Sequence, residues 1–98
     1  MSDLTFSIAK NHPCLAGHFP GQPVVPGVVI LTEVCALLKQ HDPSAVIDGV
    51  RKVKFLQKLL PEQTCWVVFN RGLKQQWRFE VWAQGFNQPA TLLAEGSF

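Results

Sequence analysis

One stretch of this sequence constrains the fold more than any other: a loop rich in proline and glycine that runs directly into an apolar segment. From Ala16 to Gly27 the loop holds three prolines and three glycines around one histidine, His18. Proline fixes the backbone angle φ and glycine permits conformations that other residues avoid, so this loop is built to hold one shape. The apolar segment from Val28 to Gln40 lacks both residues and predicts a helix. A rigid loop that presents an imidazole beside a helix N-terminus suits chemistry.

Segments in which apolar and polar residues alternate lie on both sides of this helix and predict strands. The helix ends at His41-Asp42-Pro43, because a residue before proline avoids the helical conformation. The expected strands are Leu4–Ile8, Val46–Leu56, Thr64–Asn70, Gln76–Gln84 and Ala90–Phe98. One strand, a helix that is apolar nearly all round, and then an antiparallel meander form an α+β pattern. A curved sheet that wraps the helix would bury it on most sides.

The composition limits what the chain can be. Its 98 residues predict a single domain over residues 1–98, and the 47% hydrophobic content predicts an oligomer, most simply a dimer. We see no signal peptide and no apolar run near the roughly 20 residues that span a membrane, so we expect a cytoplasmic protein without membrane contact. Three cysteines without a Cys-x-x-Cys pair argue against disulfides and zinc, and we expect no metal or cofactor.

The charged residues are distributed unevenly along the chain. The segment from Arg51 to Arg78 holds seven bases and one acid, whereas the remainder holds two bases and six acids. Both a solvated strand face and a docking surface for an acidic partner are compatible with this cluster. We do not expect nucleic-acid binding, because the three tryptophans form no exposed stacking series.

The loop and a later strand resemble a known family. The sequence from Gly17 to Val28 is similar to the signature loop of the 3-hydroxyacyl-acyl-carrier-protein dehydratases of the FabA/FabZ type. Val50–Leu56 and the turn Pro61–Thr64 resemble the middle strand and turn of that family. The small size is closer to the dehydratase-like hotdog proteins of aryl-polyene gene clusters. The resemblance implies a hotdog fold, in which a curved antiparallel sheet wraps one long central helix, and a dimer.

The resemblance also implies a reaction, the dehydration of a 3-hydroxyacyl thioester to the trans-2-enoyl thioester. His18 matches the base that removes the α-proton, and the N–H of Gly27 matches the group that polarises the thioester carbonyl. The carbonyl of Val24 lies where the family orients its histidine, and Phe19 and Val28 are expected to bind substrate. The chemistry is sensible, because proton removal builds negative charge on the carbonyl oxygen and a helix N-terminus supplies unpaired N–H donors.

One position departs from the family. Its general acid stands fourteen residues after the histidine, where this chain has Thr32, and Glu33 follows about 100° further round the helix. Three interpretations stay open. Glu33 is the acid after a local shift of the helix, or a related partner subunit supplies the acid in a heterodimer instead of a homodimer. Alternatively, the site only binds acyl thioesters or hydrolyses them.

The basic cluster fits a carrier-bound substrate. Acyl carrier proteins are acidic, as the resemblance implies, and bases near the site would speed their docking. The candidate docking residues are Arg51, Lys52, Lys54 and Arg78. The phosphates of a coenzyme A thioester would be attracted to the same bases.

Overall fold

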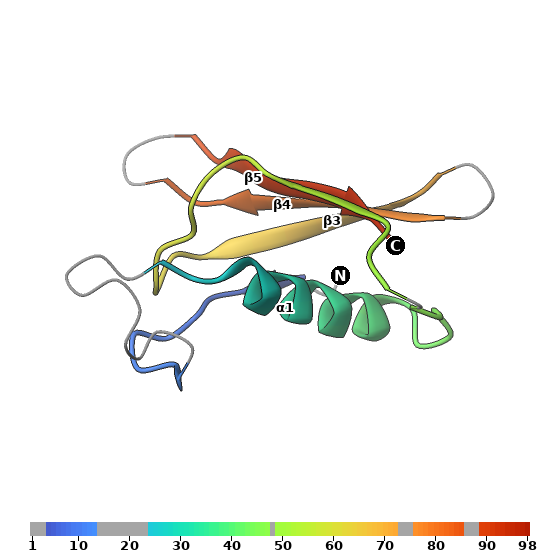
Figure 1. Cartoon of the computed structure of the whole chain (residues 1–98), viewed down its shortest axis with the longest axis horizontal. Coiled ribbons are helices and arrows are strands. Elements are labelled where there is room, and N and C mark those ends of the chain that lie inside the picture. The colour runs from blue at the N-terminus through green and yellow to red at the C-terminus, as the bar shows by residue number, and fades with distance from the viewer. Residues whose placement is uncertain (1–3, 14–23, 48, 73–75, 86–88) are drawn as a thin grey trace.

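The computed structural model describes residues 4–13, 24–47, 49–72, 76–85 and 89–98. These described residues form one helix and five strands (Figure 1). In chain order these are β1 (Thr5–Phe6), α1 (Gly27–His41), β2 (Lys52–Phe55), β3 (Cys65–Arg71), β4 (Trp77–Ala83) and β5 (Thr91–Ser97). The predicted catalytic His18 and its neighbour Phe19 lie outside the described residues.

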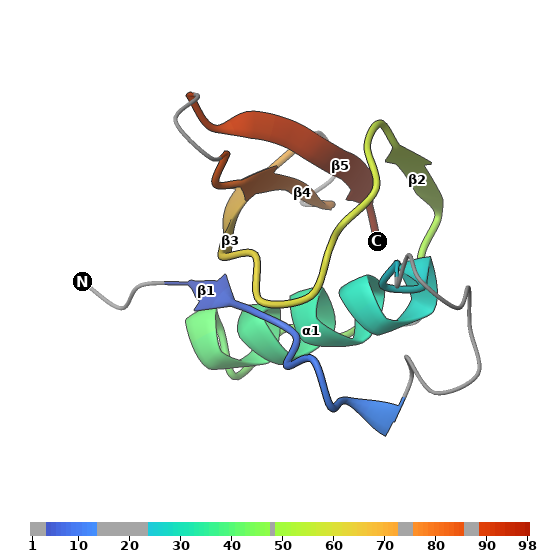
Figure 2. The same cartoon turned by 90° about the vertical axis from the view of Figure 1, so that its left-hand side faces the viewer.

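The strands form one antiparallel sheet in the order β1-β3-β4-β5-β2, and α1 lies across one face of it (Figures 1 and 2). The predicted α+β class is therefore confirmed. The predicted meander is only partly right, because it holds for β3, β4 and β5 alone. β1 and β4 occupy the two edges of β3, so β2 has no free edge there and pairs with β5 on the far side of the sheet. β2 is also shorter than the expected strand over Val46–Leu56.

The alternation in β4 sets which side chains face the helix. Phe79, Val81 and Ala83 are buried, as a half-buried strand requires, and Arg78 and Glu80 alternate with them on the other face. The register between β4 and β5 shifts at Val81/Trp82, which marks a β-bulge.

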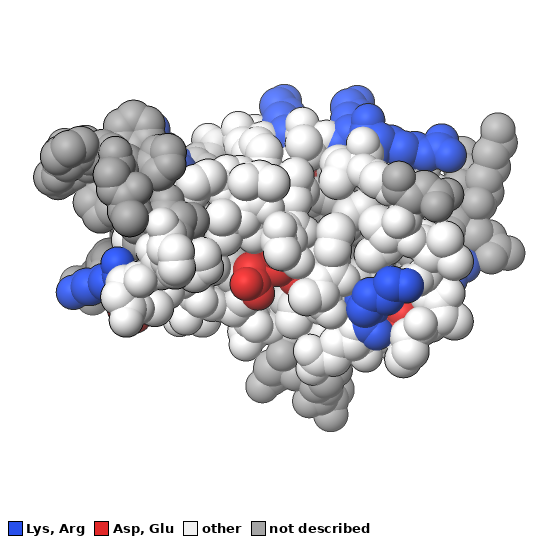
Figure 3. All heavy atoms as spheres, turned by 60° about the horizontal axis from the view of Figure 1, so that its bottom comes forward, with Lys and Arg blue, Asp and Glu red and all other residues white. Residues whose placement is uncertain are grey.

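The helix contributes one face to the core. Its buried residues, Ile30, Val34, Leu37 and Leu38, recur with the spacing of a single helical stripe. The expectation that α1 is buried on most sides is wrong for the single chain: Val28 is 70% exposed, and Thr32 and Ala36 are exposed too. The physical reason is that one sheet covers only one side of a helix. The surface on the helix side is mostly uncharged, with an acidic group near its middle (Figure 3).

The far end of α1 is tied to the sheet. The ring of His41 stacks on Phe69 at 5.7 Å between centroids and meets the edge of Trp77 at 5.8 Å. The guanidinium of Arg71 lies 4.5 Å from the centre of the Trp77 ring and forms an ion pair with Asp42 at 3.3 Å. These contacts fix where the helix stops.

Candidate functional site

The start of α1 offers unpaired hydrogen-bond donors. The helix begins at Gly27, one residue before the predicted start, and its N-cap is Pro26, which has no capping side chain. The N–H groups of Val29 and Ile30 donate to the Pro26 carbonyl at 3.0 and 3.4 Å. The N–H groups of Gly27 and Val28 come before the first such bond, and no acceptor for them lies among the described residues. With no acidic residue in the first turn, this positive helix end can receive an anionic or polarised oxygen.

The chain before the helix is held by the segment that follows β2. The N–H of Val25 donates to the Leu59 carbonyl at 2.9 Å, and both of these side chains are buried. Val24 is half-buried beside them. This anchor fixes the direction in which the loop enters α1.

The same neighbourhood contains an aromatic side chain that the sequence did not single out. A Cβ atom added to Gly27 would lie 2.8 Å from Cζ of Phe55, closer than real Cβ contacts come. The ring of Phe55 therefore abuts the helix start, and position 27 must be glycine for it to do so. Alternation with Val53 predicts the sheet face that Phe55 occupies, but only the fold brings the ring to Gly27.

The residues at the predicted acid position are not equivalent. The Thr32 hydroxyl donates to the Val28 carbonyl at 2.8 Å and lies on an exposed part of the helix. Glu33 is half-buried and precedes Val34, which is fully buried. Successive helical residues point about 100° apart, so Glu33 does not take the direction of Thr32. The predicted base, His18, is outside the described residues, so the structure gives no distance from Thr32 or Glu33 to it.

The thiols of the described part of the chain are poor nucleophiles. Burial raises the pKa of Cys65 to about 11 and raises the pKa of Cys35 above its ordinary value. Since the thiolate is the reactive form, neither residue suits covalent catalysis near neutral pH. Among the described residues no three His, Cys, Asp or Glu side chains gather as a metal site would need. None of the helices there has the length and apolarity to cross a membrane.

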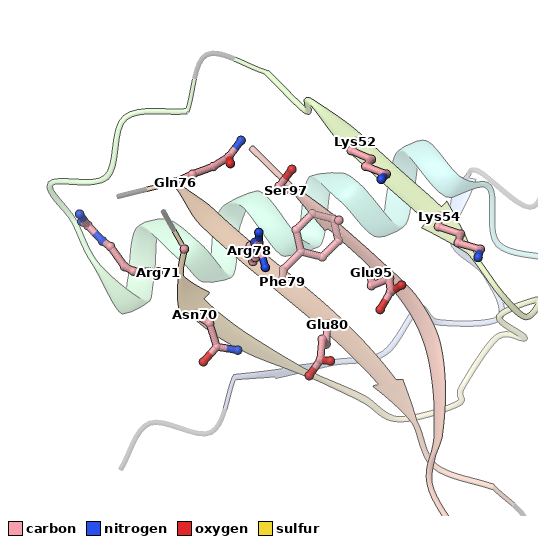
Figure 4. A pocket seen from close by; sticks show the side chains of 12 residues that line it. Lys52, Lys54, Asn70, Arg71, Gln76, Arg78, Phe79, Glu80, Glu95 and Ser97 are labelled. Atoms are coloured by element: carbon pink, nitrogen blue, oxygen red, sulfur yellow. The ribbon is translucent and has the colours of Figure 1, made fainter. Parts of the chain in front are cut away.

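A hollow of about 890 Å³ lies on the sheet face that points away from the helix (Figure 4). Three of the four predicted docking residues, Lys52, Lys54 and Arg78, line it. Lys52 and Arg78 are both paired in register with Ser97, which explains why strands far apart in sequence bring them together. The fourth predicted residue, Arg51, does not line the hollow.

The hollow also contains residues that were not predicted as site residues. The whole lining is Lys52, Lys54, Asn70, Arg71, Gly72, Gln76, Arg78, Phe79, Glu80, Glu95, Gly96 and Ser97. Glu80 and Glu95 stand directly opposite each other in the β4–β5 register, and Lys54 is the partner of Glu95 on its other side. The surface is therefore a mixed charged face, with bases on the β2 edge and at Arg71 and Arg78.

The comparisons with known proteins now decide the family. The family model of the ApeI dehydratase, ApeI-like, matches residues 1–94. The chain belongs to the ApeI-like dehydratase family. This confirms the resemblance to FabZ-type dehydratases and to the aryl-polyene group.

Several curated relatives carry the name 3-hydroxyacyl-[acyl-carrier-protein] dehydratase FabZ, and two of them illustrate the range of similarity. The protein from Anaeromyxobacter sp. (strain Fw109-5) is 41% identical over 58 residues, which cover 54% of this chain and 35% of the relative. The protein from Ehrlichia chaffeensis is 28% identical over 97 residues, which cover 91% of this chain and 66% of the relative. The match thus spans between about one third and two thirds of the length of these relatives.

A solved structure, "The Dehydratase Heterocomplex ApeI:P from Xenorhabdus doucetiae", has the same fold. Its TM-score is 0.75 at 22% sequence identity, and the match covers 95% of this chain and 80% of that one. The predicted hotdog fold is confirmed.

Proposed function

We propose that this chain catalyses the dehydration of a 3-hydroxyacyl thioester to the trans-2-enoyl thioester. The observation that carries the proposal is the uncapped helix start at Gly27, in a chain of a dehydratase family. In this reaction a base removes the α-proton, and negative charge develops on the thioester oxygen. The C–O bond at the β-carbon then breaks, the hydroxyl leaves as water after protonation, and the C=C bond forms. N–H donors at a helix start stabilise the charge on the thioester oxygen.

In this proposal His18 is the base, and the Gly27 N–H binds the thioester oxygen. A neutral imidazole is a competent base near pH 7 when a backbone acceptor fixes its tautomer, the role we assign to the Val24 carbonyl. Phe19 and Val28 would contact the substrate. The exposed position of Val28, next to the free N–H groups, is consistent with that role.

The general acid is the missing part of this chain's own site. The Thr32 hydroxyl already donates to the Val28 carbonyl, and a threonine hydroxyl is no acid at neutral pH. We infer that a related hotdog subunit supplies a carboxylic acid across a dimer interface. Val28, Thr32 and Ala36 form an exposed stripe on α1. The helix side of the molecule is mostly uncharged (Figure 3), and these two observations support a protein partner there. The similar solved structure from Xenorhabdus doucetiae is itself described as a heterocomplex.

The test is to give the chain its own acid. Thr32→Glu should raise the dehydration of 3-hydroxybutanoyl-pantetheine by the purified chain about 100-fold or more, in the range of general acid catalysis. Thr32→Gln has nearly the same shape without the acid and is the matched control. His18→Ala in the Thr32→Glu background should abolish the gain.

Glu33→Gln distinguishes the two candidate sources of the general acid, the partner subunit and Glu33 itself. If the partner supplies it, wild type alone is nearly inactive and Glu33→Gln changes nothing. If wild type alone is active and Glu33→Gln removes the activity, Glu33 is the acid and the chain is self-sufficient. Release of free thiol without an enoyl product, detected with a thiol-reactive dye, would instead identify a thioesterase.

We further propose that an acidic carrier protein delivers the substrate by docking on the hollow of the outer sheet face. Lys52 and Lys54 stand on the edge strand β2, and Lys54 directly precedes the Phe55 that abuts Gly27. The side chains of Lys54 and Phe55 lie on opposite faces of the sheet, so the docking surface and the helix start are on the two faces of one edge strand. In the Thr32→Glu background, where the chain has its own acid, Lys54→Glu should lower kcat/KM for the carrier-bound substrate several-fold, and added salt should shrink the difference. The other docking variants are compared in the same background.

The controls for docking are the substrate without its carrier and a base outside the hollow. Lys54→Glu should leave kcat/KM for the pantetheine substrate unchanged, because that substrate makes no protein–protein contact. Lys58→Glu is the matched variant, since Lys58 is exposed but does not line the hollow. A larger loss for Lys58→Glu than for Lys54→Glu would place docking elsewhere. Equal losses with a coenzyme A substrate would point to recognition of phosphate.

A further inference from the structure

Phe55 is an aromatic residue beside the helix start, and its side chain is only partly buried in the core. It belongs to β2, where it pairs with the buried Ala94 of β5, yet 43% of its surface is exposed. Its ring tip points at Gly27: a Cβ there would lie 2.8 Å from Cζ and 3.0 Å from Cε2. The ring thus borders the unpaired N–H groups and keeps an open apolar surface beside them.

This pairing of chemistries is typical of a ligand site. A small number of fixed polar donors orient a ligand, while apolar and aromatic walls bury its carbon atoms. An aromatic wall also excludes water from the donors, and this strengthens their interaction with a developing charge. A ligand that uses both parts must carry a polarised oxygen and, within one or two bonds of it, aliphatic carbon.

We propose that Phe55 is a specificity-determining residue whose ring packs against the acyl carbons of the thioester held at the Gly27 N–H. This inference rests on the proposed function and deepens it, because it assigns the residue that distinguishes an acyl thioester from the free thiol. Gly27 has a second role in this arrangement: its missing side chain lets the ring reach the helix start. Position 27 and position 55 therefore act as a pair.

The test uses ligands that need no catalysis. Calorimetry measures the affinities of butanoyl-pantetheine and of pantetheine itself, so that their ratio reports the contact with the acyl group alone. Phe55→Ala should reduce the preference for butanoyl-pantetheine about tenfold, and Phe55→Leu should retain part of it. Leu56→Ala is the matched control: Leu56 is also 43% exposed and is adjacent in sequence, but it is not among the atoms nearest Gly27. We expect its preference to stay within about twofold of wild type.

A double-mutant cycle tests the pair. Gly27→Ala keeps the backbone N–H but displaces the ring tip, so it should lower the preference for butanoyl-pantetheine about as much as Phe55→Ala does. In the Phe55→Ala background Gly27→Ala should have little further effect, because there is no ring left to displace. Two additive effects would mean that the residues act separately and would overturn the proposal.

The possible results separate this inference from the proposed function. If butanoyl-pantetheine binds with a Phe55-dependent preference, the inference stands, even if Thr32→Glu gives no dehydration. If Thr32→Glu dehydrates its substrate but Phe55→Ala leaves the preference unchanged, the inference is overturned and the reaction stands. If wild type binds neither ligand, the inference is overturned. A loss of affinity for both ligands in equal proportion would show a structural effect and would also overturn it.

Discussion

The two ends of α1 are built in opposite ways. At the C-terminal end the Asp42 N–H donates to the Leu38 carbonyl at 2.8 Å, and the Asp42 carboxylate pairs with Arg71. His41 packs there against two aromatic rings, Phe69 and Trp77, which also contact each other. At the N-terminal end Pro26 supplies no side-chain cap, and Val28 is 70% exposed. Side chains tie the C-terminal end to the sheet, whereas the N-terminal end has N–H donors with no acceptor among the described residues.

The difference shows where stability and where function are located on one helix. A missing N-cap costs about 0.5–2 kcal/mol of stability, so an open start persists only if other contacts hold the helix in place. Those contacts are the buried stripe of α1 and the tied C-terminal end. Substitutions at the closed end should therefore change stability, and substitutions at the open end should change binding.

The largest expected effect is at the closed end. Trp77→Ala removes the ring that contacts His41, Phe69 and Arg71, and it should lower the free energy of unfolding by about 2–4 kcal/mol. Urea denaturation measures the loss. Affinity for butanoyl-pantetheine per folded molecule should be unchanged, because Trp77 lies at the other end of the helix from Gly27. Trp77→Phe keeps an aromatic ring and should lose less stability. A Trp77→Ala variant that is as stable as wild type but no longer binds butanoyl-pantetheine would contradict the comparison.

The next expected effect is smaller and concerns the N-terminal end of α1, where a substitution should raise the free energy of unfolding. Pro26→Asp supplies a side chain that can cap the helix, so it should be about 1 kcal/mol more stable than the control Pro26→Ala. The same carboxylate would accept hydrogen bonds from the N–H groups proposed to bind the thioester oxygen, and its negative charge would repel that oxygen. Affinity for butanoyl-pantetheine should therefore fall as stability rises. A gain in stability with unchanged affinity would show that the open helix start binds nothing.

The positions of the helix and strands were easier to predict from the sequence than the pairing of the strands. The clean alternation from Trp77 to Val81 fixed the inward face of β4, and proline and glycine marked where α1 begins and ends. The partner of β2 was not predictable, because a four-residue strand specifies its own faces but not which free edge it joins. The contact of Phe55 with Gly27 depends on that pairing and was missed for the same reason.

The candidate site was predictable where backbone chemistry defines it and not where packing does. The free N–H at Gly27 follows from a proline and glycine before an apolar helix. The hollow combines Lys52 and Arg78 across β5, which requires the strand order. A threonine in a helix can donate to the carbonyl four residues earlier but need not, so the hydrogen bond from Thr32 to Val28 was not predictable from the residue type.

The smallest expected effect is a pH-dependent contribution of Asp42 to stability at the C-terminal end of α1. Hydrogen bonds from the Ser44 hydroxyl at 2.6 Å and the Ser44 N–H at 3.0 Å, and then Arg71, hold the pKa of Asp42 below its ordinary value of 3.8. A carboxyl whose pKa is lowered by folding adds stability above its ordinary pKa, and this stability is lost as the pH falls through the lowered value. Asp42→Asn should therefore lower the urea midpoint slightly at about pH 7, and the gap to wild type should close as the pH falls through the lowered pKa of Asp42. Ser44→Ala removes only the hydroxyl and should give part of the same pattern. A gap that stays constant with pH would mean that the Asp42 carboxylate does not help to close this end of the helix.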